Sequence, residues 1–259
     1  MGVGRVEYFP SVGSTNDVAA EWAAEGCADM SVAAADEQTE GRGRAGRKWF
    51  TPRGAALAFS VVMQPSSEED EALSRYVGLG AVAVAEALTH LYGLAPEIKW
   101  PNDVLLAGKK TCGVLAEMHW LGEQARSLIL GIGINVAPES VPEAAELSFG
   151  ATCVEGELGR AVERLPLLRE VVEQIIFWRR ALNTPRFLQR WEDYLAYRGE
   201  WVQVFTTAKT ALEGVVAGLD TGGRLRVRLG SGEEATIPTV KTTGMGEIHL
   251  RPVVDRARK

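Results

Sequence analysis

The chain has 259 residues, of which 46% are hydrophobic and 24% charged, a composition typical of a globular protein with one or two domains. The net charge of −6 argues against a protein that coats nucleic acid, because such a domain would be basic. The N-terminus lacks the apolar core of a signal peptide, and Glu86 interrupts the longest apolar stretch, which argues against a membrane span. The three cysteines and three histidines lack metal-ligand spacing, so we expect a protein of the reducing cytoplasm.

The first 199 residues predict helices and strands that alternate irregularly, as in an α+β domain with a mixed sheet and flanking helices. Serine or threonine caps and terminal glycines bound most of the predicted helices, and Thr184 with Pro185 marks the start of the last one. We expect helices at 14–26, from Ser66 or Ser67 to 93, at about 160–182 and at 184–199, and strands at 31–36, 54–63, 97–100, 103–107, 111–120 and 127–136.

After Gly199 the sequence changes to short strands at regular spacing, separated by glycine-rich turns. This pattern is typical of a small barrel, and its length of about 60 residues suits an SH3-like β-barrel at 200–259 that follows a first domain at 1–199. The strands expected here are 201–206, 212–220, 224–230, 233–240 and 246–253.

Residues 40–54 spell EGRGRAGRKWFTPRG, which contains a G-x-G-x-x-G pattern. A dinucleotide-binding turn would open a helix after these glycines, which Pro52 makes improbable, and a kinase loop would need H-R-D and D-F-G motifs that the chain lacks. A nucleic-acid patch or a solvated surface loop stays open. The glycines, the Trp49–Phe50 pair and the crowded cations favour instead a loop that becomes ordered around an anionic small molecule.

Three further segments carry polar residues beside apolar strands. In KWPNDV (99–104), Pro101 marks a strand end, so Asn102 and Asp103 either point into a cleft or form a plain turn. GKKTCG (108–113) places two lysines at a hairpin, and GIGIN (131–135) ends on Asn135, which is either a functional amide or a simple end of a strand.

The chain resembles the bacterial biotin protein ligases in five segments taken in order. These are STND (14–17), EQTEGRGRAGRKWFTPRG (37–54), KWPNDVLL (99–106), GKKTCGVLAEM (108–118) and LILGIGINV (128–136). The resemblance is strong over about residues 5–137 and looser beyond. The departures are Ala45, where the family often has a basic residue, and the hairpin near the C-terminus. Because Ser14 already belongs to the first motif, the chain resembles the monofunctional class without a DNA-binding domain.

The resemblance implies a two-step ligase reaction. Biotin reacts with ATP, in the presence of Mg²⁺, to give biotinyl-5′-AMP and pyrophosphate, and a lysine of the biotin carboxyl carrier protein of acetyl-CoA carboxylase then takes the biotin. It implies a cytoplasmic enzyme that binds neither DNA nor membrane, and it leaves a homodimer open. The alternatives are a lipoate ligase, against which the G-R-G-R-x-G-R loop argues, and a non-catalytic nucleic-acid binder, against which the acidic charge argues.

The resemblance also implies roles for individual residues. Lys110 and Arg44 would be catalytic, Lys110 being favoured over Lys109 by the offset to Gly113, and Asp103 would contact Mg²⁺ directly or through water. The residues expected at biotin are Ser14, Thr15, Asn16, Gln38, Arg42, Gly43, Arg44, Lys110 and Gly113. Those expected at ATP or the adenylate are Arg42, Arg44, Lys48, Trp49, Lys99, Asn102, Asp103 and Asn135.

Overall fold

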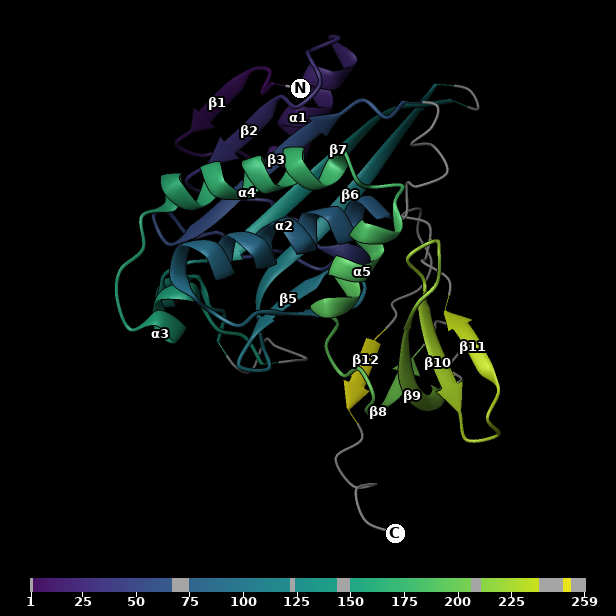
Figure 1. Ribbon diagram of the computed structural model, residues 1–259. Helices are drawn as coiled ribbons and strands as arrows, with labels where there is room; N and C mark the ends of the chain where they lie inside the picture. The colour runs from purple at the N-terminus through teal and green to yellow at the C-terminus, as the bar shows by residue number, and fades with distance from the viewer. Residues whose placement is uncertain are drawn as a thin grey trace.

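The computed structural model describes residues 2–66, 75–121, 124–143, 150–205, 211–237 and 249–252, and it contains two β-sheets with helices on the larger one (Figure 1). No helix in these ranges is long and apolar enough to cross a membrane. The helices are α1 (Thr15–Ala24), α2 (Arg75–Tyr92), α3 (Val154–Leu158), α4 (Arg164–Arg179) and α5 (Pro185–Asp193), with short 3-10 turns η1 (Arg44–Gly46) and η3 (Pro138–Ser140).

The larger sheet has seven strands in the order β1-β2-β3-β7-β6-β5-β4. Their bounds are β1 (Val6–Phe9), β2 (Val32–Ala35), β3 (Ala56–Met63), β4 (Glu97–Lys99), β5 (Asp103–Leu106), β6 (Lys109–Leu121) and β7 (Gln124–Asn135). Strand β1 runs parallel to β2, and every other neighbouring pair is antiparallel, so the sheet is mixed as predicted. The sequence did not reveal β1, because its four residues include Glu7 and Tyr8 and only half of them are partly covered.

The two faces of this sheet are covered by different helices, because side chains of a strand alternate between faces. Ala33, Val62 and Ile129 pack against α1 in a small apolar cluster. Their neighbours Ala34, Val61 and Leu130 belong to the main core beneath α2 and α4. Figure 1 shows α2 and α4 lying across one face, with α1 on the opposite side. The sheet therefore carries the main core on one face and α1 with its smaller cluster on the other.

The C-terminal part forms a separate antiparallel sheet of five strands in the order β11-β10-β9-β8-β12. The strands are β8 (Trp201–Phe205), β9 (Ala211–Leu219), β10 (Leu225–Leu229), β11 (Glu234–Ile237) and β12 (His249–Pro252). Four lie within segments where strands were predicted, and β9 begins one residue before its predicted segment, so the α+β class is confirmed. The ends of the last two predicted strands lie outside the described residues.

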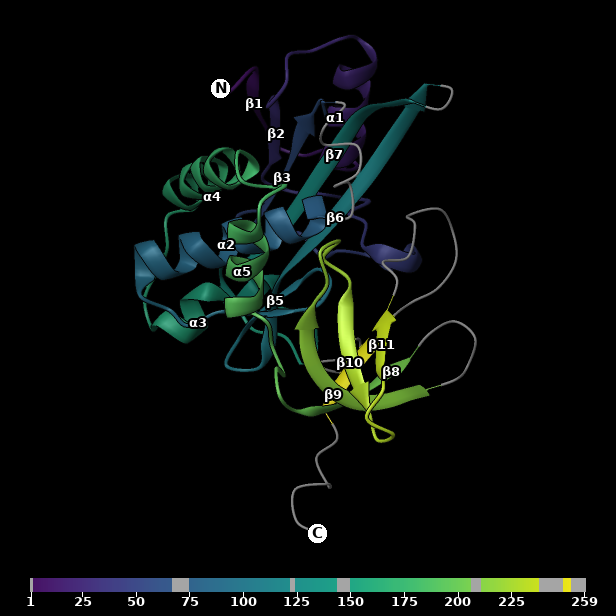
Figure 2. The same cartoon turned by 45° about the vertical axis from the view of Figure 1, so that its right-hand side comes forward.

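Two tryptophans join the sheets. Trp191 of α5 is fully buried, and its ring lies against Gly78 of α2 and Gly223 in the turn between β9 and β10. Beside it, the indole nitrogen of Trp100 donates a hydrogen bond to the Gly223 carbonyl oxygen at 3.0 Å. Figure 2 shows α5 between the helical layer and the smaller sheet. The two sheets consequently share one apolar core, which includes Val202, Val216 and Leu225.

Helix α5 is shorter than predicted, because the edge strand β4 needs backbone partners. Thr184 is the N-cap and Pro185 the first residue, as expected, but the helix ends at Asp193 rather than near Gly199. The Ile98 N–H donates to the Tyr194 carbonyl oxygen at 2.6 Å, and the Ala196 N–H donates to the Ile98 carbonyl oxygen at 3.0 Å. These bonds draw the chain out of the helix. The predicted start of α2 after Ser66 lies outside the described residues, and α3 was not predicted.

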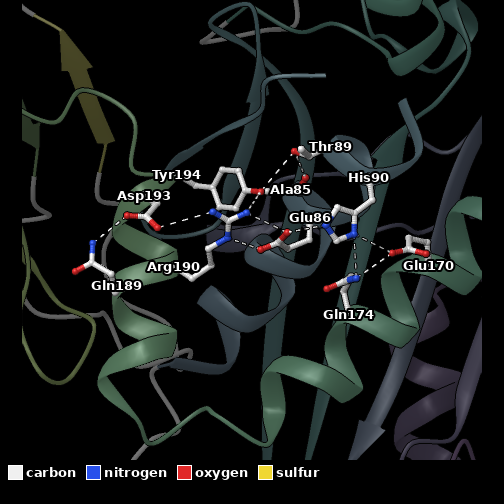
Figure 3. A network of polar contacts seen from close by, with 10 residues as sticks. All are labelled: Ala85, Glu86, Thr89, His90, Glu170, Gln174, Gln189, Arg190, Asp193 and Tyr194. Carbon is white, nitrogen blue, oxygen red and sulfur yellow. Dashed lines mark hydrogen bonds and ion pairs between the residues drawn. The ribbon is translucent and has the colours of Figure 1, made fainter. Parts of the chain in front are cut away.

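A polar network crosses the helical layer and holds α5 against α2 and α4 (Figure 3). Glu86, which is 3% exposed, accepts hydrogen bonds from Arg190 of α5 and lies 3.4 Å from the His90 Nε2 atom. The other ring nitrogen of His90 lies 3.4 Å from Glu170 of α4. The glutamate that interrupts the apolar stretch of α2 is thus paired rather than exposed, since a buried carboxylate is costly without partners.

The contact between Gly78 and Trp191 predicts that a single added methyl group destabilises the protein. A Cβ at Gly78 would lie 2.4 Å from the Trp191 ring, whereas a Cβ at Gly230 would lie 3.7 Å from the Trp201 ring. We expect Gly78→Ala to lower the free energy of unfolding by about 1–3 kcal/mol despite alanine's better helix propensity. Gly230→Ala is the matched control and should change it by less than about 0.5 kcal/mol in denaturant titrations. Equal stabilities of the two variants would contradict this account.

Candidate active site

The floor of the candidate site is a patch of small residues on the α1 face of the large sheet. In β3, Ala58 and Ser60 stand opposite Gly133 and Gly131 of β7, and Gly133 in turn stands opposite Gly113 of β6. None of these residues carries more than one heavy side-chain atom beyond Cβ. The backbone is therefore open to whatever lies above it, and the start of α1 and the loop at residues 40–53 lie there.

A chain of hydrogen bonds lines one end of this floor. The Thr15 backbone N–H donates to the Gln38 side-chain oxygen at 2.8 Å, and the buried Ser60 hydroxyl lies 2.7 Å from the Thr15 hydroxyl and 2.6 Å from the Asn16 side-chain oxygen. A Cβ at Gly131 would lie only 2.2 Å from that oxygen, so glycine there makes room for Asn16. Ser14, Thr15 and Asn16 are all buried. The sequence interpretation named these residues and Gln38 but missed Ser60.

Arg42, in the loop, is held by two carboxylates from different elements. Its guanidinium makes two hydrogen bonds to Asp17 of α1, at 2.6 and 2.7 Å, and lies 3.6 Å from Glu117 of β6. The hydrogen bonds from Arg42 lower the pKa of Asp17, and the same bonds raise the pKa of Arg42. Glu117 also accepts a hydrogen bond from the side-chain amide of Asn16. Sequence reasoning missed the roles of Asp17 and Glu117.

Trp49 covers the glycines of the floor. A Cβ at Gly133 would lie 2.2 Å from the indole nitrogen, and a Cβ at Gly113 would lie 3.1 Å from the ring. The Trp49 backbone N–H donates to the Gly41 carbonyl oxygen at 2.8 Å, and this bond holds the backbone of Trp49 to the start of the loop. The indole N–H is buried without a hydrogen-bond partner in the described part of the chain. Such a donor costs free energy unless a ligand acceptor satisfies it.

Charged residues gather beside Trp49 at the turn between β4 and β5. The Lys110 ammonium lies 2.6 Å from an Asp103 carboxylate oxygen and 5.4 Å from the centre of the Trp49 ring. Arg44 donates to the Asn102 side-chain oxygen at 3.1 Å, and Asn102 in turn donates to the Val114 carbonyl oxygen. The structure thus brings Arg44, Trp49, Asn102, Asp103 and Lys110 together, while Lys109 is exposed. Among the described residues, no three His, Cys, Asp or Glu side chains form a group suited to a metal ion.

Four of the other predicted residues occupy different surroundings. Lys99 is buried at the end of β4, opposite Asp103 in the strand register. Asn135 is buried at the end of β7, where its side-chain amide donates to the Thr152 carbonyl oxygen at 3.1 Å. Lys48 is exposed. Gly43, the fourth residue, lies within the loop, where its N–H donates to the Arg47 carbonyl oxygen at 2.7 Å. Asn135 therefore helps to hold the neighbouring segment, whatever else it contacts.

The loop follows an irregular path, with the 3-10 turn Arg44–Gly46 and no helix over residues 47–54, as Pro52 predicted. Arg42 does not need an external anion, contrary to the prediction for the cations of this loop, because Asp17 supplies a carboxylate. The expected ordering of the loop around a ligand stays a prediction.

One ion pair closes the stem of the loop, where its two ends meet. Asp36, which follows β2, accepts hydrogen bonds from the Gly54 N–H at 3.1 Å and from Arg164 of α4 at 2.6 Å. Arg164 also donates to the Ala56 carbonyl oxygen at 3.1 Å. Burial alone would raise the pKa of Asp36, but hydrogen bonds from Arg164 and Tyr8 outweigh it and hold that pKa below its ordinary value.

Comparison with known proteins places this architecture among ligases. Residues 8–135 match the model of the biotin/lipoate A/B protein ligase family. The chain is 33% identical over 219 residues to the biotin–acetyl-CoA-carboxylase ligase of Paracoccus denitrificans, covering 82% of this chain and 89% of that one. It is 32% identical over 224 residues to the bifunctional ligase/repressor BirA of Bacillus spizizenii, covering 86% of this chain. The chain spans about 63% of the length of that relative.

Solved structures give the same result. The biotin protein ligase from Aquifex aeolicus in complex with biotin and ATP aligns with a TM-score of 0.80 and 29% identity, covering 96% of this chain and 99% of that one. The biotin protein ligase from Leishmania major in complex with biotinyl-5-AMP aligns with a TM-score of 0.62 over 91% of this chain and 99% of that one, and at 20% identity it shares the fold.

The Asp36–Arg164 pair predicts a pH-dependent contribution to stability. Because the folded state holds the pKa of Asp36 down, the stabilisation is complete above the ordinary aspartate pKa of about 3.9 and is lost as the pH falls through the folded value. Asp36→Asn should lower the free energy of unfolding by about 1.5–3 kcal/mol near pH 7, and the difference should shrink below about pH 4. Glu37→Gln, which removes an exposed pair with Arg53, is the control and should have little effect. A difference for Asp36→Asn that is independent of pH would contradict the assignment.

Proposed function

Since the chain belongs to the biotin/lipoate A/B protein ligase family, we propose that it is a biotin–acetyl-CoA-carboxylase ligase. The enzyme activates biotin with ATP to biotinyl-5′-AMP and transfers biotin to a lysine of the biotin carboxyl carrier protein. The observation that carries the proposal is the glycine floor with Trp49 and Lys110 above it, formed by the segments that match the family.

In the first step, a biotin carboxylate oxygen attacks the α-phosphorus of ATP, and the bond from that phosphorus to the β-phosphate oxygen breaks to release pyrophosphate. Both reactants are anionic, so the protein must neutralise charge and position the reactants. We assign Lys110 and Arg44 to this task, because Lys110 lies against Trp49 and Asp103, and Arg44 bonds to the adjacent Asn102. Mg²⁺ enters as part of the Mg·ATP substrate, and Asp103 is the carboxylate that we assign to it.

In the second step, the neutral amine of the carrier lysine attacks the acyl carbon of the adenylate and AMP leaves. The mixed anhydride is sensitive to water, so a covering loop protects it until the carrier protein arrives. We assign Arg42, Gly43 and Arg44 to this covering loop. Trp49, with an unsatisfied indole N–H, would border the nucleotide.

The polar chain at the start of α1 suits the head group of biotin. Ser14, Thr15, Asn16 and Gln38 supply hydroxyl and amide groups, with Thr15 bonded to Gln38 and Asn16 lying against Gly131. A cyclic urea has both donors and acceptors, and such a mixed set of groups can pair with each of them. Lys99, Lys48 and Asn135 are assigned to the nucleotide by resemblance alone.

The domain arrangement is part of the proposal. We infer a catalytic domain at 1–199 and an SH3-like barrel at 200–259, formed by the five-stranded sheet. Support comes from the change in sheet at β8 and from the Aquifex aeolicus likeness, which extends over 96% of this chain. The acidic net charge and the free cysteines Cys27, Cys112 and Cys153 fit a cytoplasmic enzyme that does not act on DNA.

The proposed reaction predicts exchange of labelled pyrophosphate into ATP that depends on biotin. Full-length protein with ATP and Mg²⁺ should show exchange when biotin is present, and none when lipoate or octanoate replaces it. Exchange with lipoate and not with biotin would move the protein to the lipoate branch. Absence of exchange with every acid would refute the ligase activity.

The surroundings of the two adjacent lysines predict unequal effects on the first step. Lys110 lies against Asp103 and Trp49, whereas Lys109 is exposed. We expect Lys110→Ala to lower kcat/KM for adenylate formation by 100-fold or more, roughly 3 kcal/mol, as for the loss of one well-placed oxyanion partner. Lys109→Ala should stay close to wild type, and both variants should keep the wild-type Tm within a few degrees. Equal values of kcat/KM would show that the assignment of Lys110 is mistaken.

A further inference from the structure

The ion pair between Arg42 and Asp17 has a geometry that ordinary surface pairs lack. Each terminal nitrogen of the Arg42 guanidinium donates to a different carboxylate oxygen of Asp17, at 2.7 and 2.6 Å. This two-pronged arrangement is the strong form of an arginine–carboxylate contact, because it fixes direction as well as distance. The pair joins the loop to the first turn of α1, the turn that also supplies Thr15 and Asn16 to the candidate site.

The two carboxylates around Arg42 come from different elements. Asp17 belongs to α1, and Glu117, at 3.6 Å, belongs to β6. Glu117 is itself held by the Asn16 amide, so Arg42, Glu117 and Asn16 are connected in one network. The loop is therefore bound both to α1 and to the sheet. Its other fixed points are Trp49 on the glycine floor and Arg44 on Asn102.

The charge balance at this point does not suit a guanidinium that binds an anionic ligand. One positive charge on Arg42 faces two carboxylates, so the local sum is negative, and an approaching carboxylate or phosphate would be repelled. The side chain of Arg42 is better suited to closing the loop than to holding a substrate anion. The neighbouring Arg44 has different surroundings, since its guanidinium donates to the side-chain oxygen of Asn102.

From this geometry we propose that Asp17 is a positioning residue for the ligase reaction, which holds Arg42 and so keeps the loop closed over the bound acyl-adenylate. The inference rests on the proposed function for its effect on the adenylate. The effect on the loop itself does not depend on any ligand. The side chains are 40% and 51% exposed, so water and salt weaken the pair, and it can open when the carrier lysine must enter.

The test compares Asp17→Asn with wild type in the full chain. Protein loaded with labelled biotin and ATP is diluted, and the release of biotinyl-adenylate is followed at several salt concentrations. At low salt we expect release from Asp17→Asn to be roughly two- to five-fold faster, the range for exposed pairs, and to change less with salt than release from wild type. Asp17→Glu keeps the carboxylate and should restore slow release in part. Glu7→Gln breaks a similarly exposed pair between Glu7 of β1 and the preceding Arg5, and this variant should behave as wild type.

The rate of amide hydrogen exchange over residues 41–49 is measured in the ligand-free proteins, so it does not depend on ligase activity. Asp17→Asn should exchange faster there than wild type and Glu7→Gln, with an unchanged Tm. If wild type makes no adenylate, the ligase activity is refuted while the exchange result still decides the role of Asp17. If exchange and release in Asp17→Asn equal those of wild type, the positioning role of Asp17 is refuted.

Discussion

The candidate site depends on a sheet whose two faces have opposite requirements. One face of β3, β6 and β7 must fill the space beneath α2 with bulky side chains such as Val61, Leu130 and Val114. The other face must stay clear, and it does so by placing Gly113, Gly131 and Gly133 at alternate positions. Because side chains alternate strictly along a strand, a shift of one residue in register would exchange these faces. The long β3–β7 and β6–β7 pairings therefore fix which side chains face the candidate site as well as which side chains face the core.

The cleared floor explains why the loop can lie where it does. Trp49 can rest on Gly133 only because no Cβ projects there, and Asn16 can turn toward Ser60 only because Gly131 leaves room. The cations of the loop contact polar side chains of neighbouring elements. Arg42 pairs with Asp17 and Glu117, and Arg44 bonds to Asn102. The protein thus supplies counter-charges for Arg42 itself, which lowers the cost of keeping so basic a loop closed.

The smaller sheet contributes indirectly. Its turn at Gly223 accepts the hydrogen bond of Trp100, and Trp100 lies two residues before Asn102 in the same tight turn. Trp191 fills the space behind it, between Gly78 and Gly223, and the Glu86–Arg190 pair holds its helix in place. Packing of the two sheets therefore supports the backbone on which Asn102 and Asp103 sit.

The sequence alone determined the elements with strong local signals and the residues within contiguous motifs. The cap of α5, the apolar strands and the irregular course of residues 40–54 follow from neighbours a few positions away. The preference for Lys110 over Lys109 comes from the family resemblance and stays a prediction. What only the tertiary structure decided is which distant residues meet. Ser60 lies in no motif, and the motifs that contain Asp17 and Glu117 do not show that these two side chains meet at Arg42. Their relation to Asn16 and Arg42 arises from the register of β3 and β6 and the packing of α1. The early end of α5 has the same origin, since the backbone of β4 outcompetes a local helix pattern for hydrogen bonds. Local propensity is a property of short segments, whereas the pairing of strands across the sheet is fixed by the packing of the whole core. The candidate site needs both, because its motifs are local and the contacts between them are not.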